Sequence, residues 1–159
     1  MTNKSALKGG AYERKIKDLL TAHYGINFER VPHSGALKYL KGDVWAPHHM
    51  HIWQYTIECK HYKDLEFKNL LVAKSNDIHS FWAQASEEAA IMAKESGTEK
   101  YPLLIFRWNR SKDYVAWNTE FDCETQFSVK AFGNFYKIAL LEDWLKENTK
   151  LLEKLKQPK

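Results

Sequence analysis

The residues best suited to chemistry are an acid and a lysine two positions apart, Glu58 and Lys60, at the end of the segment HIWQYTIECK. Successive side chains of a β-strand point to opposite faces, so this pair would project from one face. Asp43 follows Gly42 in an earlier strand-like segment, and a hairpin would bring it beside Glu58. Two carboxylates and an amine are the minimum for metal-assisted hydrolysis of a phosphodiester.

The predicted chemistry depends on a divalent metal. Asp43 and Glu58 offer hard carboxylate oxygens, which Mg²⁺ prefers as ligands. Such an ion would stabilise charge developing on a phosphate and lower the pKa of bound water, while Lys60 orients that water or the phosphate. Glu13, on a helix near the N-terminus, would complete the metal shell.

The acid and lysine pattern is weak by itself, because it occurs at 13–15, 58–60 and 66–68. Residues two apart on a helix point in different directions, so the helical pair at 13–15 cannot face one site. Only the pair at 58–60 ends a strong strand signal. The alternative reading of that pair is a solvated ion pair contributing roughly 0.2–1 kcal/mol.

These residues together resemble the PD-(D/E)xK nuclease superfamily. The segments KGGAYERKIKDLL, FERVPHSGA, GDVW and IECKHYK resemble, more closely, the archaeal and phage Holliday junction resolvases. The likeness runs through residues 8–63, extends loosely to the helix around Gln84 and the strand YPLLIFRW, and ends at about residue 120.

The resemblance implies specific roles at the site. Lys60 would be the catalytic lysine, and Ser34, in the SGA loop, would meet the scissile phosphate. The cofactor would be Mg²⁺, with Mn²⁺ as a substitute. The implied metal ligands are the carboxylates of Glu13, Asp43 and Glu58 and the backbone carbonyl of Cys59. The residues expected to contact DNA are Arg14, Arg30, Ser34, Lys38 and Lys41.

The resemblance also implies an activity. Such resolvases act as two-fold dimers, and each subunit nicks one strand of a four-way DNA junction. Two alternatives stay open: another nuclease of the superfamily, such as a restriction-like, flap or nicking repair enzyme, and a non-catalytic DNA-binding module of the same fold. Gln84 is either helix surface or a support for water on the metal. Glu88, four residues later, stands where some exonucleases of the superfamily place a tyrosine, which argues against that group.

Composition is consistent with a nucleic-acid partner. The chain has 159 residues, a single domain by length, and a net charge of +4. Residues 1–42 carry eight Lys and Arg against three Asp and Glu, which favours an anionic partner for this part. Cys59 and Cys123 show no metal or disulfide spacing and are expected to be reduced packing residues. Without a signal peptide or membrane span, we expect a cytoplasmic, intracellular protein.

Periodicity places these residues on an α/β fold. We expect a restriction-endonuclease-like mixed central sheet with helices on both faces, as one nuclease domain over 1–159 with a core at about 8–120 and a helical extension at about 139–156. Residues 61–75 give no clear signal. The predicted helices are 11–25, 77–96 and 140–155, and the predicted strands are 26–32, 42–47, 51–60, 101–108, 112–117 and an edge strand at 126–132.

Overall fold

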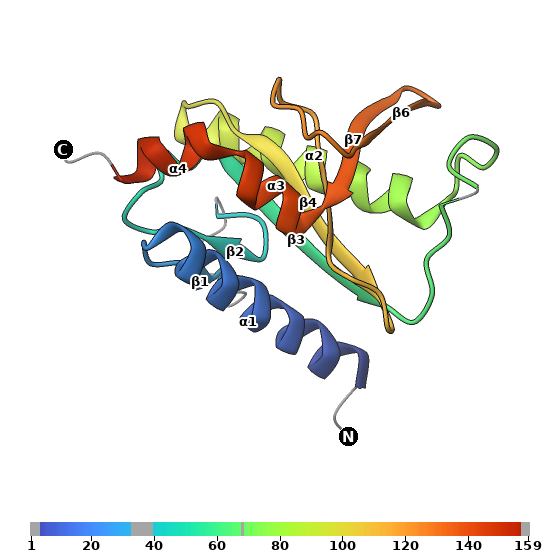
Figure 1. The fold of residues 1–159 in the computed structure, drawn as a ribbon, viewed down its shortest axis with the longest axis horizontal. Coiled ribbons are helices and arrows are strands. Elements are labelled where there is room, and N and C mark those ends of the chain that lie inside the picture. Colours follow the sequence, from blue (N-terminus) through green and yellow to red (C-terminus); the bar gives the residue numbers. More distant parts are fainter. Residues whose placement is uncertain (1–3, 33–39, 68, 157–159) are drawn as a thin grey trace.

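The computed structural model describes residues 4–32, 40–67 and 69–156. It shows an α/β fold in which helices cover both faces of one mixed sheet (Figure 1). In chain order the elements are α1 (Lys4–Tyr24), β1 (Glu29–Arg30), β2 (Val44–Trp45), β3 (Tyr55–Tyr62), α2 (Asp77–Ser96), β4 (Tyr101–Trp108), β5 (Tyr114–Trp117), β6 (Phe127–Ala131), β7 (Asn134–Leu140), α3 (Leu141–Glu147) and α4 (Thr149–Lys156).

The sheet has the strand order β1-β2-β3-β4-β5-β7-β6. Among the described strands, β3 and β4 form the parallel pair, in a register that sets Glu58 beside Leu104, and every other neighbouring pair is antiparallel. A parallel pair requires a crossover connection, and α2 provides it. The predicted hairpin of β2 and β3 is confirmed, with Val44 opposite Ile57.

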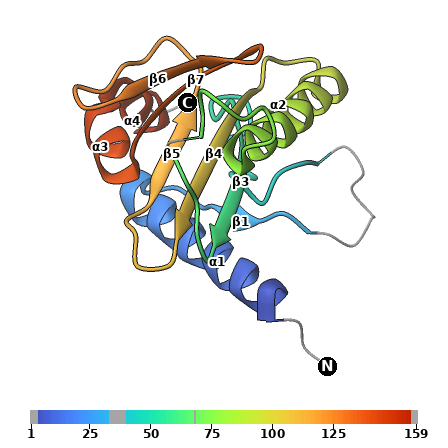
Figure 2. The ribbon, with the colours of Figure 1, turned by 90° about the vertical axis from the view of Figure 1, so that its right-hand side faces the viewer.

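Helices lie on both sides of the sheet (Figure 2), and each face of the sheet carries its own apolar core. On one face, Ile57 and Cys59 of β3 pack in a cluster with α1, α3 and α4, which includes Ile16 and Trp144. On the other face, α2 packs Phe81 and its neighbours against β4, β5 and β7. The strand alternation therefore turns Glu58 and Lys60 toward α2, away from α1.

The crossover helix α2 has the ends that its sequence predicts. The Asn76 side chain accepts a 2.9 Å hydrogen bond from the backbone amide of Ile78, which makes it the N-cap. Gly97 adopts the left-handed conformation, and its amide donates to the carbonyl of Ala93. Ala85 and Ala89 are fully buried, so the helix backbone can approach the sheet closely where Glu58 lies.

Three features of the secondary structure differ from the sequence prediction. The first helix begins at Lys4, so Gly9 and Gly10 lie inside it rather than before it. Residues 134–140 form β7, a strand that was not predicted from the sequence. The predicted helix at 140–155 is two helices. Asn148 ends α3, and its backbone amide donates a hydrogen bond to the Trp144 carbonyl.

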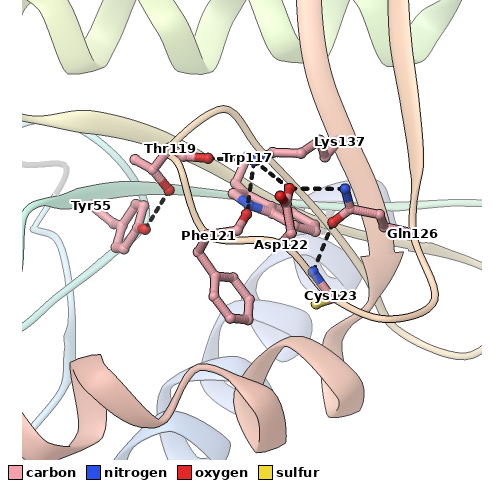
Figure 3. A network of polar contacts seen from close by, with 8 residues as sticks. All are labelled: Tyr55, Trp117, Thr119, Phe121, Asp122, Cys123, Gln126 and Lys137. Atoms are coloured by element: carbon pink, nitrogen blue, oxygen red, sulfur yellow. Dashed lines mark hydrogen bonds and ion pairs between the residues drawn. The ribbon is translucent and has the colours of Figure 1, made fainter.

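The segment after residue 120 is tied to the sheet by Lys137 of β7 (Figure 3). Its buried ammonium donates to the carbonyls of Thr119 and Phe121 and to the carboxylate of Asp122. Both cysteines are free and buried, as expected. Within the described ranges, none of the helices combines the length and apolar character needed to cross a bilayer.

Candidate active site

Asp43 is held at the junction between β2 and β3 by its backbone and its side chain. Its amide donates 2.7 Å to the carbonyl of Ile57, and its carbonyl accepts 2.9 Å from the amide of Val31. The amide of Cys59 donates 2.8 Å to Asp43 Oδ2. These bonds aim the Asp43 carboxylate along β3, between the two residues that the sequence pattern singled out.

Gly42 makes this arrangement possible. Its φ is +90°, and a Cβ at this position would lie 2.8 Å from the carbonyl oxygen of Ile57. A side chain would therefore clash with the strand whose Ile57 carbonyl accepts the hydrogen bond from the Asp43 amide. Glycine is required here both for its conformation and for the close approach of the two backbones.

Glu58 and Lys60 lie on the same face of β3, as predicted. Glu58 is 2% exposed, and its Oε2 lies 4.0 Å from the Lys60 ammonium. The ammonium also lies 5.4 Å from the centre of the Phe81 ring on α2. This is a partly buried pair under a helix, not the solvated pair of the alternative reading.

Glu13 enters the site from α1 and is 9% exposed. The helix is fixed to the sheet beside it, because the Tyr12 hydroxyl donates 2.9 Å to Asp113 before β5. The Glu13 carboxylate forms an ion pair with Arg30 of β1, with Nη2 to Oε2 at 3.1 Å. Arg14 approaches the same place: a Cβ on Gly10 would lie 3.4 Å from an Arg30 nitrogen and 3.6 Å from one of Arg14.

Helix α2 brings two polar side chains to the same carboxylates. Gln84 is exposed on the helix surface, and its Nε2 also donates to Glu58 Oε2 over 3.4 Å, so it is a surface residue that reaches the site. Glu88, one turn later, lies near enough to Glu58 to raise the pKa of its carboxyl group. Glu88 was not predicted to take part in the site. Glu88 follows Gln84 by four residues, as Ala89 follows Ala85, and this spacing was the sequence signal that Glu88 and Gln84 share one face of the helix.

The carboxyl groups hold their protons unusually tightly. Burial raises the pKa of Asp43 to about 6. The hydrogen bond from the Cys59 amide lowers this pKa, and the charges of Glu13 and Glu88 raise it further. Burial, the Glu88 side chain and the Asp43 charge raise the pKa of Glu58 to about 10, although Lys60 opposes the shift. Like charges therefore converge in a site of low polarity.

The oxygen donors of this site suit a divalent cation by their chemistry, although among the described residues they are not gathered into a metal shell. Within the described parts of the chain, no three His, Cys, Asp or Glu side chains are close enough to hold a metal ion as they stand. Nevertheless, buried carboxylates that raise each other's pKa are what a bound cation would relieve, and hard oxygens suit Mg²⁺ or Mn²⁺. One Glu88 oxygen, Oε2, is inaccessible and has no hydrogen-bond partner among the described residues, which leaves a donor for such an ion.

The remaining predicted residues have different positions. The Cys59 amide contacts the Asp43 carboxylate, whereas the Cys59 carbonyl, predicted as a metal ligand, belongs to the following peptide group and stays a prediction. Lys41 precedes Gly42, and its amide donates to the sulfur of Met92 on α2. Ser34 and Lys38 lie outside the described residues.

Comparison with known proteins identifies the family of this chain. Residues 4–152 match the family model described as "Phage putative PDDEXK endonuclease". The chain belongs to this family. The match extends through β6, β7 and α3, which lie beyond the range of the likeness predicted from sequence. The protein is therefore an endonuclease of the PD-(D/E)xK superfamily, whose members generally use divalent metals.

A phage relative and a solved structure are also similar to this family member. The chain is 34% identical to Protein D14 of Escherichia phage T5 over 121 residues, which cover 73% of this chain and 72% of the relative. It is 16% identical to the solved structure of Hjc, a Holliday junction resolvase from Archaeoglobus fulgidus, with a TM-score of 0.40. This match covers 91% of this chain and 98% of the archaeal chain. A TM-score at this level carries no functional conclusion.

Proposed function

We propose that this endonuclease requires Mg²⁺, accepts Mn²⁺, and cuts branched DNA, with the four-way junction as its preferred substrate. The observation that carries the proposal is that the Asp43 carboxylate is bound to the Cys59 amide, between Glu58 and Lys60 of β3, where the charge of Glu13 on α1 also acts on it. The preference for junctions rests on the sequence likeness of residues 8–63 to resolvases.

Each residue has a role in the proposed reaction. Asp43 and Glu58 hold the divalent cation, with Glu13 and the Cys59 carbonyl as further ligands. When bound, the cation stabilises the negative charge that develops on the scissile phosphate. The Lys60 ammonium, between Glu58 and Phe81, donates to the phosphate or to the attacking water. Gln84 holds the Glu58 carboxylate in place through its amide.

The basic residues beside the site support binding to the DNA backbone. Arg14 is exposed, and Arg30 is partly exposed while it pairs with Glu13. Lys41 lies just before Asp43, and Lys38 and Ser34 belong to the same stretch of sequence. Contacts to phosphates carry no base preference, so binding should tolerate any sequence and should weaken as salt is raised.

A homodimer is part of the proposal, because paired nicks require two sites. The hairpin of β6 and β7 leaves Phe127, Phe132 and Phe135 between 43% and 50% exposed, which supports contact with a second copy. Sedimentation of the full chain with and without a junction would measure the assembly. A chain that remains a monomer on the junction would contradict the dimer.

A cleavage assay tests the function. Wild-type protein and Asp43→Asn would be incubated with a mobile-core junction, a flap, a linear duplex and a single strand, in Mg²⁺, Mn²⁺ or EDTA. We expect paired symmetric nicks in the junction with either metal, and none in EDTA or with Asp43→Asn. Preferred cutting of another substrate would replace the junction assignment, and intact DNA at enzyme excess would indicate a non-catalytic binding module.

A further inference from the structure

The aromatic side chain of Tyr62 is exposed beside the candidate active site. Tyr62 ends β3, and strand alternation places it on the same face as Glu58 and Lys60. It is 42% exposed, and among the exposed large apolar side chains of the described residues it is the one that β3 carries. Two residues along a strand span about 7 Å, so Tyr62 lies one step beyond the amine proposed to face the phosphate.

Tyr62 is held in place by helix α2 and by β4. Its ring lies 4.8 Å from that of Phe81 at an interplanar angle of 33°, and the Lys60 ammonium lies 5.4 Å from the centre of the same Phe81 ring. The backbone amide of Asn109 donates 3.0 Å to the Tyr62 carbonyl, which continues the β4 pairing to the end of the strand. A tyrosine has few side-chain torsions, so a ring held in this way loses little entropy when a ligand covers it.

The surroundings of Tyr62 favour a flat ligand attached to a phosphate, which is a nucleobase. One exposed tyrosine by itself indicates no ligand, because scattered apolar side chains are common on protein surfaces. Here, however, the exposed ring and the Lys60 ammonium lie against the same Phe81 ring, so a phosphate at Lys60 would bring its nucleotide close to Tyr62. Bases along one strand are about 3.4 Å apart, so the base in reach lies within about two nucleotides of that phosphate.

We propose that Tyr62 is a base-stacking site, which takes an unpaired base within about two nucleotides of the phosphate that faces Lys60. The inference rests on the proposed cleavage of branched DNA, and it names the feature of the branch that the enzyme recognises. Bases inside a duplex are covered by their neighbours, and removing one from its stack costs least where it is already unpaired. Stacking on Tyr62 therefore favours DNA with an unpaired base over continuous duplex, whatever the sequence.

Binding of the full chain to matched DNAs, in EDTA, tests the site. The probes are a linear duplex, the same duplex with one unpaired base, a single strand and a four-way junction. Tyr62→Leu removes the aromatic face but keeps an apolar contact for Phe81, and Tyr62→Trp restores a stacking face. We expect Tyr62→Leu to lose about 5- to 100-fold in affinity for every probe except the linear duplex, while Tyr62→Trp binds as wild type.

Tyr101→Leu is the matched control, because Tyr101 is a partly exposed tyrosine at the opposite end of the β3 and β4 pair. It should bind every probe as wild type does. If Tyr62→Leu lost affinity equally for all the probes, linear duplex included, Tyr62 would act through packing and the assignment would be wrong.

Photocross-linking locates the base that Tyr62 contacts. 5-Iodouracil would replace single bases around the branch point and at the unpaired position, and the irradiated complexes would be mapped by mass spectrometry. We expect wild-type protein to cross-link through Tyr62 to the unpaired base, and Tyr62→Leu to lose this cross-link. If the bases at all these positions cross-linked elsewhere and none to Tyr62, the assignment would be overturned.

These measurements separate the stacking site from the proposed function. If wild type cuts junctions, but Tyr62 forms no cross-link and Tyr62→Leu binds all the probes as wild type, the stacking site fails and the function stands. If wild type cuts no branched DNA, but Tyr62 cross-links to the unpaired base, the junction assignment fails and the stacking site stands. If wild type shows neither cleavage nor the cross-link, both fail together.

Discussion

The amide of Cys59 donates a 2.8 Å hydrogen bond to Oδ2 of Asp43, and so joins the turn before β2 to the middle of β3. This bond favours the ionised form of Asp43, but burial and the neighbouring carboxylates outweigh it, so the pKa of Asp43 stays raised at about 6. The hydrogen bond positions the acid, and the site as a whole still disfavours its charge.

The metal-free protein should therefore lose stability as pH rises. Between the ordinary Asp value of 3.8 and about 6, the unfolded chain releases a proton that folded Asp43 keeps, so the free energy of unfolding falls. Glu58 extends the fall from 4.5 toward about 10. Asp43→Asn can still accept the Cys59 bond without charge. In EDTA at pH 8, this substitution should raise the free energy of unfolding by at most about 3 kcal/mol and the melting temperature by several degrees. At pH 4 it should change both values little.

Asp18→Asn is the control for that measurement, because Asp18 lies on α1 with a side chain that is 74% exposed. Its melting temperature should follow wild type at every pH. If Asp43→Asn were less stable than wild type at pH 8 in EDTA, the charge of Asp43 would not be what destabilises the metal-free protein.

Gly42→Ala should abolish cleavage and destabilise the protein. A Cβ at this position lies 2.8 Å from the Ile57 carbonyl oxygen, so the turn that aims Asp43 must move. Gly97→Ala is the control, since Gly97 also has a positive φ but a Cβ added there would meet no heavy atom within 4 Å. The control should cost about 1–2 kcal/mol and leave cleavage intact. Equal effects of both changes on cleavage would show that the close approach at Gly42 is unimportant.

Lys60→Ala should lower the cleavage rate by about 100-fold or more, because it removes the amine that faces the phosphate. DNA affinity should stay close to that of wild type, since one partly buried lysine contributes little to an extended phosphate surface. Lys63→Ala, an exposed change just beyond β3, is the control and should keep the full rate. Single-turnover cleavage and a filter-binding titration would measure the two effects. Loss of affinity without loss of rate would reassign Lys60 to DNA binding.

Lys137→Met should destabilise the protein by about 2–4 kcal/mol, because it leaves the carbonyls of Thr119 and Phe121 without their buried charged donor. Lys137, shown in Figure 3, lies on β7, which β5 and β4 separate from β3 in the sheet, so cleavage below the melting temperature should persist. Lys130→Met, on the exposed side of β6, is the control for chemical denaturation. Two variants of equal stability would mean that the network does not hold the 118–126 segment.

The elements around the site were predictable because their signals are local. The β-branched and aromatic alternation of β3 and the Asn76 and Gly97 caps of α2 do not depend on distant contacts. Asp43, Glu58 and Lys60 were found together because strand alternation and one hairpin determine their arrangement.

The errors came from tertiary contacts that override local signals. In β7, Tyr136 and Ile138 face α2, while Lys137 is buried on the other face by its bonds to the 118–126 segment, so polar alternation is absent. Asn148 lies within a continuous leucine pattern, and only its buried position and its bond to Trp144 end α3. Gly10 fits inside α1 beside the Arg30 guanidinium. Glu88 required knowing which face of α2 lies over β3.

The parallel pairing of β3 with β4 sets the order in which the protein becomes competent. Asp43, Glu58 and Lys60 are synthesised first, but β3 lacks its central neighbour until α2 has crossed and residues 101–108 have left the ribosome. A chain released early would carry the side chains proposed to be catalytic without the β4 neighbour that positions β3. We therefore expect DNA cleavage to begin only after residues 101–108 have been synthesised and have paired with β3.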